Sequence, residues 1–361
     1  MRVGVVKESK VREHRVSLTP SGTEALVAHR HQVLIEKNAG LGSGFSDQDY
    51  CEVGGEIVSS AEAWACDLVL KVKEPQVSEY CHFNRQIVFT YFHLAGSPAS
   101  LTAALLARRT TAIAYETVED GAGRLPLLAP MSAVAGSMAV TIGNYYLADF
   151  NHGRGVLLTQ LFDQRFGKVV IIGDGVVGLH AARVATGLGA EVYLCGCDPE
   201  RKAELEAFVS GKLNFVLSTP DNIAAELHDT DLLIGAVLQR GARAPHLVTE
   251  AMVKQMQRGS VIVDVSIDQG GCIETMHATT LDDPVYEKYG VIHYGVTNMP
   301  GAYPRVSTLA LTEATLPYVL ALADKGLTAL NEDPGLALGL NTYDGKITCE
   351  AVAEAFASAG V

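Results

Sequence analysis

The sequence is poor in basic residues and has no long uninterrupted apolar run. Its 361 residues include 28 Lys and Arg against 41 Asp and Glu, which gives a formal net charge of −13. Such a chain repels nucleic acid and anionic membrane surfaces, so neither is expected as a partner. Glycines and polar residues interrupt the apolar stretch at 128–150, which favours a buried helix over a membrane span. Charges interrupt the first ten residues, so no signal peptide is predicted and a cytoplasmic location is expected.

The cysteines lack the pairing of a disulfide framework. They number seven and are scattered along the chain, which fits reduced thiols in a cytoplasmic enzyme. Cys195 and Cys197 stand one residue apart, but no further ligands at a matching spacing complete a metal site with them. We therefore predict strand packing for these two cysteines, and no bound metal.

An apolar content of 48% with 19% charged residues is typical of a globular chain, and the length allows two domains. Short apolar segments alternate with helical patterns. In the first part of the chain, strands are predicted at 3–6, 32–36, 68–71, 86–90 and 111–114, with helices at about 60–66 and 97–107. Thr19 and Pro20 predict a further helix start, with Thr19 as the N-cap. This alternation predicts βαβ units and a parallel sheet.

The alternation restarts at Lys168 and continues through 232–235 and 261–265. An apolar helix at about 130–149 separates the two halves, and a second helical pattern covers 307–325. The tail that follows is too short for a domain, so we expect it to pack on the N-terminal half. The sequence thus predicts an α/β protein with two Rossmann-like doubly wound domains joined by long helices. Residues 1–127 with 303–361 would form a discontinuous substrate domain, and 128–302 a dinucleotide-binding domain.

Residues 169–200 read VVIIGDGVVGLHAARVATGLGAEVYLCGCDPE, with a Gly-x-Gly-x-x-Gly turn between an apolar strand and a helix. Gly173 permits a tight turn, Gly175 a close approach of the pyrophosphate, and Gly178 close packing of helix on strand. The helix N-terminus offers unpaired N–H groups to the phosphates. The strand, turn, helix and second strand together predict dinucleotide binding, against the alternative of a glycine-rich turn in an unliganded domain.

Two residues of this unit depart from the usual pattern. The second strand usually ends on a carboxylate that binds the adenosine ribose and repels a 2′-phosphate, but Gly196 stands there. Asp198 is expected to reach the ribose, which favours NAD. Arg201 or Lys202 would instead meet a 2′-phosphate, so NADP stays open. Asp174, inside the turn, would repel the pyrophosphate unless it points to solvent, which we expect.

Motifs spread over nearly the whole chain resemble the alanine dehydrogenase family. They are, in order, EHRVSLTP, LKVKEP, FTYFHLA, IAYETV, LPLLAPMS, LLIGAVL, VIVDVSIDQGGC, HYGVTNMPGA and TLPYVL. The resemblance implies NAD-dependent interconversion of L-alanine with pyruvate and ammonia, and a homo-oligomer, usually a hexamer. The chain departs from the family pattern at TQLFDQ (159–164), Ser137, Gly196 and Glu313, which bears on nucleotide choice and assembly more than on the reaction.

An amino-acid dehydrogenase must bind a carboxylate, transfer a hydride and move protons. The planar guanidinium of Arg15 matches a carboxylate, and Lys73, at a strand end, suits the carboxylate or carbonyl oxygen of pyruvate. His93 also ends a strand, and its imidazole suits acid–base work near neutral pH. From the residues alone, a surface Arg15 and a structural His93 are favoured, and the resemblance reverses both. It also implies that Asp268 pairs with His93 in proton transfer; which of them takes the proton from the attacking water stays open.

The other residues expected around the cofactor lie at strand ends and helix starts of the second domain. They are Ser132, Asn298 and Met299 beside the nicotinamide, Ser218, Val237 and Leu238 beside the adenosine, and Val176, Val177, Ile267 and Asp268 along the rest of the dinucleotide. Tyr115 and Glu116 belong to the pyruvate side or to its support.

Other functions stay open at this point. Arg15 and Lys73 recognise only a shared carboxylate, so a dehydrogenase of another small amino acid, a lysine-condensing relative, or an enzyme with an NADP preference fits them too. A non-catalytic NAD(H)-binding paralogue is supported only by TQLFDQ and Gly196. The soluble domain of a proton-pumping transhydrogenase shares the fold but lacks the Arg, Lys and His set.

Overall fold

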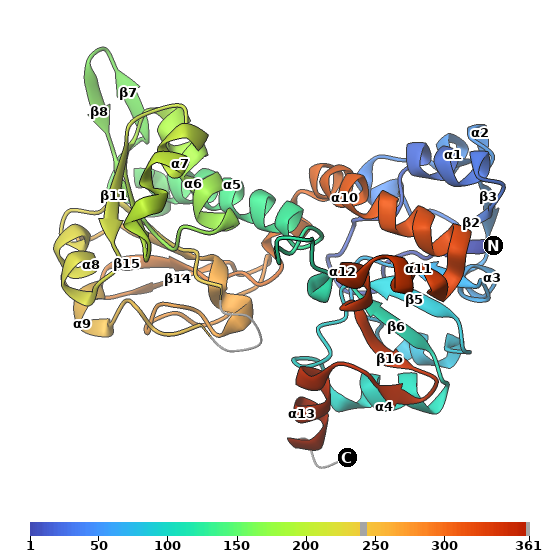
Figure 1. The fold of residues 1–361 in the computed structure, drawn as a ribbon. Helices are drawn as coiled ribbons and strands as arrows, with labels where there is room; N and C mark the ends of the chain where they lie inside the picture. Colours follow the sequence, from blue (N-terminus) through green and yellow to red (C-terminus); the bar gives the residue numbers. More distant parts are fainter. Residues whose placement is uncertain (239–243, 359–361) are drawn as a thin grey trace. The chain divides into compact units, whose positions relative to one another are not determined.

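A computed structural model describes residues 1–238 and 244–358, and these fold into two compact units (Figure 1). Unit 1 comprises residues 1–131 and 303–361, and unit 2 comprises 132–302. The division falls inside helix α5 (Ala129–Tyr146) rather than at residue 127. The last three residues of the predicted substrate domain, and 239–243 of the predicted dinucleotide-binding domain, lie outside the described residues.

Unit 1 is built on an eight-stranded sheet with the order β17-β16-β6-β5-β4-β1-β2-β3. Its parallel strands are β1 (Arg2–Val5), β2 (Gln32–Glu36), β3 (Glu56–Val58), β4 (Leu68–Leu70), β5 (Ile87–Thr90) and β6 (Thr111–Ala114). From the tail, β16 (Leu340–Tyr343) pairs antiparallel with β6, and β17 (Lys346–Ile347) pairs with β16. The tail therefore packs on the N-terminal half, as the sequence predicts. The sequence does not predict β3, which has only three residues.

The helices of unit 1 connect and flank these strands. They are α1 (Pro20–Ala28), α2 (Asp47–Glu52), α3 (Ser60–Trp64), α4 (Ala99–Ala107), α10 (Pro304–Lys325), α11 (Ala329–Glu332), α12 (Pro334–Ala337) and α13 (Glu350–Ser358). The Thr19 hydroxyl accepts a hydrogen bond from the Gly22 amide, 3.2 Å away, with Pro20 as the first helical residue, so the predicted N-cap is confirmed. Helix α10 packs against α1.

Unit 2 has a seven-stranded sheet with the order β11-β10-β9-β12-β13-β15-β14. The strands are β9 (Lys168–Ile172), β10 (Glu191–Gly196), β11 (Leu213–Leu217), β12 (Leu232–Gly235), β13 (Val261–Asp264), β14 (Val285–Lys288) and β15 (Val291–Tyr294). Only β14 is antiparallel to its neighbour. Numbered in sequence from β9, the order reads 3-2-1-4-5-7-6, and its first five strands have the order of a dinucleotide-binding fold with its switch point between β9 and β12. Helices α6 (Val176–Leu188), α7 (Lys202–Phe208), α8 (Pro220–Leu227) and α9 (Glu250–Val253) connect the strands.

The stretch TQLFDQ forms most of a hairpin of β7 (Thr159–Leu161) and β8 (Gln164–Phe166), which projects from unit 2 in Figure 1. Its turn residue Phe162 is 97% exposed and has a left-handed backbone with φ 54°. The departure from the family pattern is therefore a regular surface element rather than a loop in the cofactor turn.

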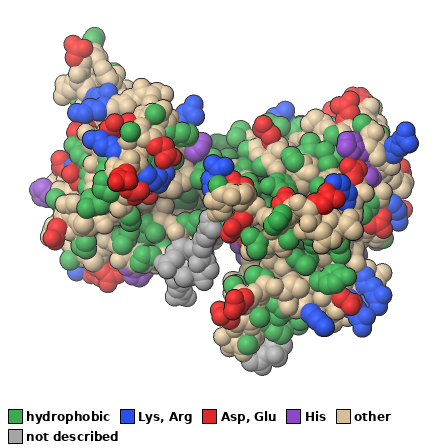
Figure 2. All heavy atoms as spheres, viewed as in Figure 1, with side chains coloured by type: hydrophobic (Ala, Val, Ile, Leu, Met, Phe, Trp, Pro, Cys, Tyr) green, Lys and Arg blue, Asp and Glu red, His purple; other side chains and the backbone are tan. Residues whose placement is uncertain are grey.

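Acidic and basic side chains are interspersed on the visible face of each unit (Figure 2). One described helical segment, Pro304–Glu332, is long and apolar enough to cross a membrane, with a mean hydropathy of 1.4. Core helices of soluble proteins meet the same criterion, and 44% of this apolar stretch is buried inside the structure. The stretch at 128–150, which the sequence singles out, is not the one that meets it.

Candidate active site

The candidate residues of unit 1 follow four neighbouring strands of its sheet. Arg15 follows β1, Lys73 follows β4, His93 follows β5 and Glu116 follows β6. Because these strands are parallel, their carboxyl ends lie at one edge of the sheet, which is where open α/β sheets bind ligands. The fold thus collects segments distant in sequence at a single edge.

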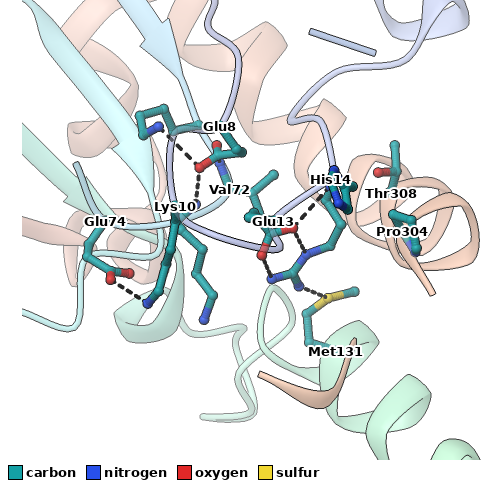
Figure 3. Close-up of polar contacts among 12 residues, drawn as sticks. Glu8, Lys10, Glu13, His14, Val72, Glu74, Met131, Pro304 and Thr308 are labelled. Atoms are coloured by element: carbon teal, nitrogen blue, oxygen red, sulfur yellow. Dashed lines mark hydrogen bonds and ion pairs between the residues drawn. The ribbon is translucent and has the colours of Figure 1, made fainter. Parts of the chain in front are cut away.

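Arg15 is buried and bound by the carboxylate of Glu13, a residue that no motif in the sequence indicates. Its Nε lies 2.7 Å from Glu13 Oε1 and its Nη2 lies 2.6 Å from Glu13 Oε2, while Nη1 lies 3.0 Å from Met131 Sδ (Figure 3). Burial lowers the pKa of Arg15, but the bonds to Glu13 outweigh it and raise the pKa above its ordinary value. The guanidinium therefore remains charged, with its orientation fixed by a two-point ion pair.

Lys71 and Lys73 differ sharply in their surroundings. The Lys71 ammonium is buried between Glu8 and Glu79, with N–O distances of 3.1 and 3.0 Å, so it belongs to a structural ion cluster. Glu8 also accepts hydrogen bonds from the amides of Val72 at 2.7 Å and Lys73 at 3.4 Å (Figure 3). Glu8 thereby fixes the backbone after β4, and Lys73 is only half-buried.

His93 lies on a turn that Glu116 holds in place. Its backbone has φ 48°, in the left-handed region, and its amide donates to Glu116 Oε1 at 2.6 Å, while the Phe92 amide donates to Oε2 at 3.2 Å. A non-glycine residue in this conformation is uncommon, and such strain often marks a functional position. The imidazole stacks on Tyr91 at 5.8 Å between ring centroids and is 46% exposed, so it is accessible. Glu116 thus supports His93.

Tyr115 lies beneath these residues. It is fully buried, with its ring edge-on to Phe89 and Tyr91 at 4.4 and 5.0 Å between centroids. Its hydroxyl has no hydrogen-bond partner among residues 1–238 and 244–358. These contacts give Tyr115 a packing role in unit 1.

In unit 2, the glycine turn has the geometry that a dinucleotide requires. Gly173 has φ 111°, and a Cβ placed there would stand 2.5 Å from the Ala236 oxygen. A Cβ on Gly178 would stand 1.8 Å from the Gly173 oxygen, whereas one on Gly175 meets nothing within 4 Å. Gly178 therefore permits close packing, and Gly175, the N-cap of α6, leaves the helix N-terminus open to phosphate.

Helix α5 packs closely on the start of α6, because a Cβ on Gly136 would lie 2.1 Å from the Val177 oxygen. Ser132 lies one turn before Gly136 on the same face of α5, which directs it toward the N-terminus of α6. The half-buried Ser132 therefore lies on the α5 face that packs at the glycine turn.

At the end of β10, the Ser218 amide donates to the Gly196 oxygen at 2.8 Å, so Ser218 lies beside Gly196. Asp198 is exposed, and its Oδ1 accepts from the Glu200 amide at 2.9 Å. Arg201 Nη1 lies 2.9 Å from Asp174 Oδ2. The expectation that Asp174 points to solvent is therefore wrong, because its carboxylate is held by this ion pair and is only 20% exposed.

The remaining predicted cofactor residues follow β12, β13 and β15. The Val237 amide donates to Ser266 Oγ at 2.9 Å, which ties the ends of β12 and β13 together. Asp264 is buried and accepts from the amides of Ser266 and Cys272, so it is structural, whereas Asp268 is exposed. Leu238 follows β12 and is exposed, and Ile267 follows β13 and is buried. After β15, Asn298 is half-buried and Met299 is buried.

One expectation from the distribution of cysteines needs correction, and the sequence does not indicate one cluster of ligand-type side chains. Cys195 is buried in β10, but Cys197 lies beyond the strand and is exposed, so strand packing does not apply to it. Ligand-type groups of His29, His31 and Asp324 all lie within 4.8 Å of one another. These two histidines precede β2, so the cluster is at the opposite edge of the sheet from His93. Asp324 comes from α10, far away in sequence, and hydrogen bonds of 2.7 and 3.0 Å account for the cluster.

The family of the chain is shown by its similarity to known proteins. The model for the N-terminal domain of alanine dehydrogenase/PNT matches residues 4–135, and that for the C-terminal domain matches residues 139–350. An alanine dehydrogenase of Staphylococcus haemolyticus is 51% identical over 360 residues, which cover 99% of this chain and 96% of that protein. The chain belongs to the alanine dehydrogenase family. Alanine dehydrogenase 2 of Staphylococcus aureus (strain USA300) gives the same identity and coverage.

Two solved structures are similar to the chain over nearly its whole length. An L-alanine dehydrogenase superposes with a TM-score of 0.95 at 48% identity, covering 99% of this chain and 100% of that chain. A transhydrogenase from Sinorhizobium meliloti superposes with a TM-score of 0.85 at 25% identity, covering 96% and 100%. The predicted fold class, family resemblance, NAD as cofactor and assignment as an amino-acid dehydrogenase are confirmed.

Proposed function

We propose that the chain catalyses the NAD-dependent oxidative deamination of L-alanine to pyruvate and ammonia, and the reverse reductive amination. The observation that carries the proposal is the placement of Arg15, Lys73 and His93 at the carboxyl edge of one sheet in a member of this family. This set can bind a carboxylate and move a proton, which are the two tasks that the chain itself must perform.

The residues of unit 2 fit NAD. Gly175 leaves space at the N-terminus of α6 for the pyrophosphate, and Gly173 and Gly178 shape the turn around it. Ser218, beside Gly196, would lie along the adenosine, and Ser132, Asn298 and the neighbours of Asp268 along the nicotinamide. When bound, NAD supplies the hydride acceptor.

Arg15 and Lys73 would bind the substrate carboxylate. Glu13 binds the Nε and Nη2 atoms of the guanidinium, and Nη1 lies beside Met131 Sδ. We assign the end that carries Nη1 to the substrate carboxylate. Lys73, fixed at its backbone by Glu8, adds a second positive charge at the same edge of the sheet. Together they would orient L-alanine with its α-hydrogen toward the hydride acceptor, as productive transfer requires.

His93 would move the protons. After hydride loss, the imine of pyruvate must add water and release ammonia, and each step needs a group that accepts and returns a proton. We assign this work to His93 with Asp268, a pairing that requires both groups to meet the same substrate during the reaction. Glu116 would fix the orientation of His93 through its two backbone bonds.

We further propose that the substrates are L-alanine, pyruvate and ammonia, that the enzyme works in the cytoplasm, and that it forms a homohexamer. The scattered free cysteines and the acidic net charge of −13 support the cytoplasmic location. The family resemblance supports the homohexamer. Light scattering coupled to gel filtration measures the number of subunits directly.

Oxidation of NADH in the presence of pyruvate and ammonia tests the activity. His93→Ala should lower kcat by about 10²- to 10⁴-fold while leaving NADH binding intact. The matched control is His228→Ala, since His228 is exposed and accepts a hydrogen bond from Gln257 through its backbone oxygen, which the substitution keeps. Wild-type turnover by the His93 variant would refute its assignment. A panel of other small oxo acids checks the specificity for pyruvate, and oxidation of neither NADH nor NADPH would favour a binding protein.

A further inference from the structure

At the end of β10, neighbouring side chains fill the space that a side chain at position 196 would occupy. A Cβ on Gly196 would stand 2.8 Å from Asp174 Oδ2 and 2.9 Å from Asp174 Cγ, and 2.7 Å from a ring carbon of Phe215. Gly196 is not among the glycines with positive φ, so its backbone does not require glycine. The space beside Gly196 is instead occupied by two side chains, the Phe215 ring and the Asp174 carboxylate.

Arg201 fixes this carboxylate. Its Nη1 lies 2.9 Å from Asp174 Oδ2 and 3.3 Å from the Asp174 carbonyl oxygen, and its Nε lies 3.4 Å from Glu204. A charge-assisted bond to two atoms of one residue gives Asp174 a defined direction, toward the end of β10. The Arg201 guanidinium is therefore paired with two carboxylates, those of Asp174 and Glu204.

We propose that Asp174 is the residue that binds the adenosine ribose of NAD and disfavours NADP. In dinucleotide-binding folds a carboxylate at the end of the second strand performs this task, through bonds to the ribose hydroxyls and repulsion of a 2′-phosphate. Here a carboxylate reaches the same point from the glycine turn, with Gly196 making the room and Arg201 as the positioning residue. The proposal deepens the proposed function and rests on its NAD binding.

The competing assignment is Asp198, which the sequence favours. Asp198 is exposed, lies two residues beyond the end of β10, and caps the short turn that follows by accepting from the Glu200 amide. Asp174, by contrast, is mostly covered and occupies the space of a side chain at position 196. The structure therefore moves the expected contact from Asp198 to Asp174.

Removal of the Asp174 carboxylate should lower the affinity for NADH and raise the affinity for NADPH. The ribose loses a charge-assisted hydrogen-bond acceptor, so NADH should bind about 10-fold more weakly or worse. Arg201 keeps Glu204 but loses the negative charge beside its Nη1, which frees this nitrogen for a 2′-phosphate, so NADPH should bind more tightly. In Asp174→Asn, the ratio of the NADH and NADPH affinities should therefore change by a larger factor than the affinity for either cofactor. Adding Arg201→Ala should cancel the gain in NADPH affinity.

Fluorescence titration of the full chain with NADH and with NADPH tests this without turnover. We expect Asp174→Asn to lower the NADH preference about 10-fold or more. Asp221→Asn on α8 is the matched control. An unchanged ratio in Asp174→Asn, or a ratio that falls in Asp198→Asn instead, overturns the proposal. A chain that binds NADH with this dependence but does not act on alanine would refute the proposed function alone.

Discussion

The ion pair between Glu13 and Arg15 allows a prediction about stability. The two side chains are 0% and 2% exposed, and their bonds are 2.6 and 2.7 Å long. Glu13→Gln keeps the shape of the side chain but removes its charge, and it turns an amide group toward Nη2, which is itself a donor. The buried guanidinium then loses its two-point ion pair with Glu13, and breaking a buried ion pair in this way costs about 3–5 kcal/mol.

Thermal unfolding measures this cost. For a unit of this size, 1 kcal/mol corresponds to about 2–4 °C, so Tm should fall by roughly 6–20 °C. Below the transition, kcat/KM for pyruvate should also fall, because the guanidinium loses two of the contacts that orient it. The affinity for NADH should not change, since Arg15 is in unit 1.

The matched control is Glu332→Gln, which breaks an exposed ion pair with Lys325. Surface pairs of this kind contribute about 0–1 kcal/mol, so Tm should change little. If Glu13→Gln and Glu332→Gln lowered Tm equally, the buried pair would not hold Arg15, and the assignment of its outer edge to the substrate would lose its basis.

Three further outcomes are expected. A Cβ on Gly175 meets no atom within 4 Å but one on Gly178 meets a carbonyl oxygen at 1.8 Å, so Gly178→Ala should lower Tm and Gly175→Ala should weaken only NADH binding. Glu116→Gln weakens the acceptor for two amides at His93, and kcat should fall about 10-fold at constant NADH affinity. Burial lowers the pKa of His293 to about 4, so the free energy of unfolding, measured in urea, should fall by about 2 kcal/mol between pH 7.5 and 5.

The sign for His293 follows from proton uptake. The unfolded chain binds a proton at this imidazole below its ordinary pKa of 6.5, whereas the folded chain does so only near 4, so acid favours unfolding in this window. His293→Gln should remove this part of the slope. An equally steep slope in His293→Gln would contradict the role of His293. Equal Tm values for Gly175→Ala and Gly178→Ala would contradict the close packing at Gly178. An unchanged kcat in Glu116→Gln would contradict the role of Glu116 in positioning His93.

Local signals in the sequence predict local structure well. The cap at Thr19, the turn at Gly173 and the strands with strong apolar patterns all depend on residues within a few positions of each other, and the structure has them. Short elements such as β3 have too few residues for a periodic pattern. Only the family motifs indicate the substrate-side residues, because single Arg, Lys and His residues carry no periodic signal.

What the sequence misses are the partners of its charged residues. Asp174 and Arg201 are 27 positions apart, and neither residue type indicates that the carboxylate turns toward β10. Glu13 stands only two residues before Arg15, yet a charge pair at that spacing in a loop is usually solvated. Burial decides both cases, and burial depends on packing from the whole unit.

The pairing of β16 with β6 bears on the order in which the chain acquires function. The backbone beside Arg15 is held by α10, since the Val16 amide donates to Thr308 Oγ1 at 3.1 Å across 292 positions of sequence. Unit 2 is a continuous segment and can form during synthesis, whereas the sheet of unit 1 is completed only when residues beyond 340 have left the ribosome. We therefore expect the nascent chain to bind NAD before it can bind a substrate carboxylate.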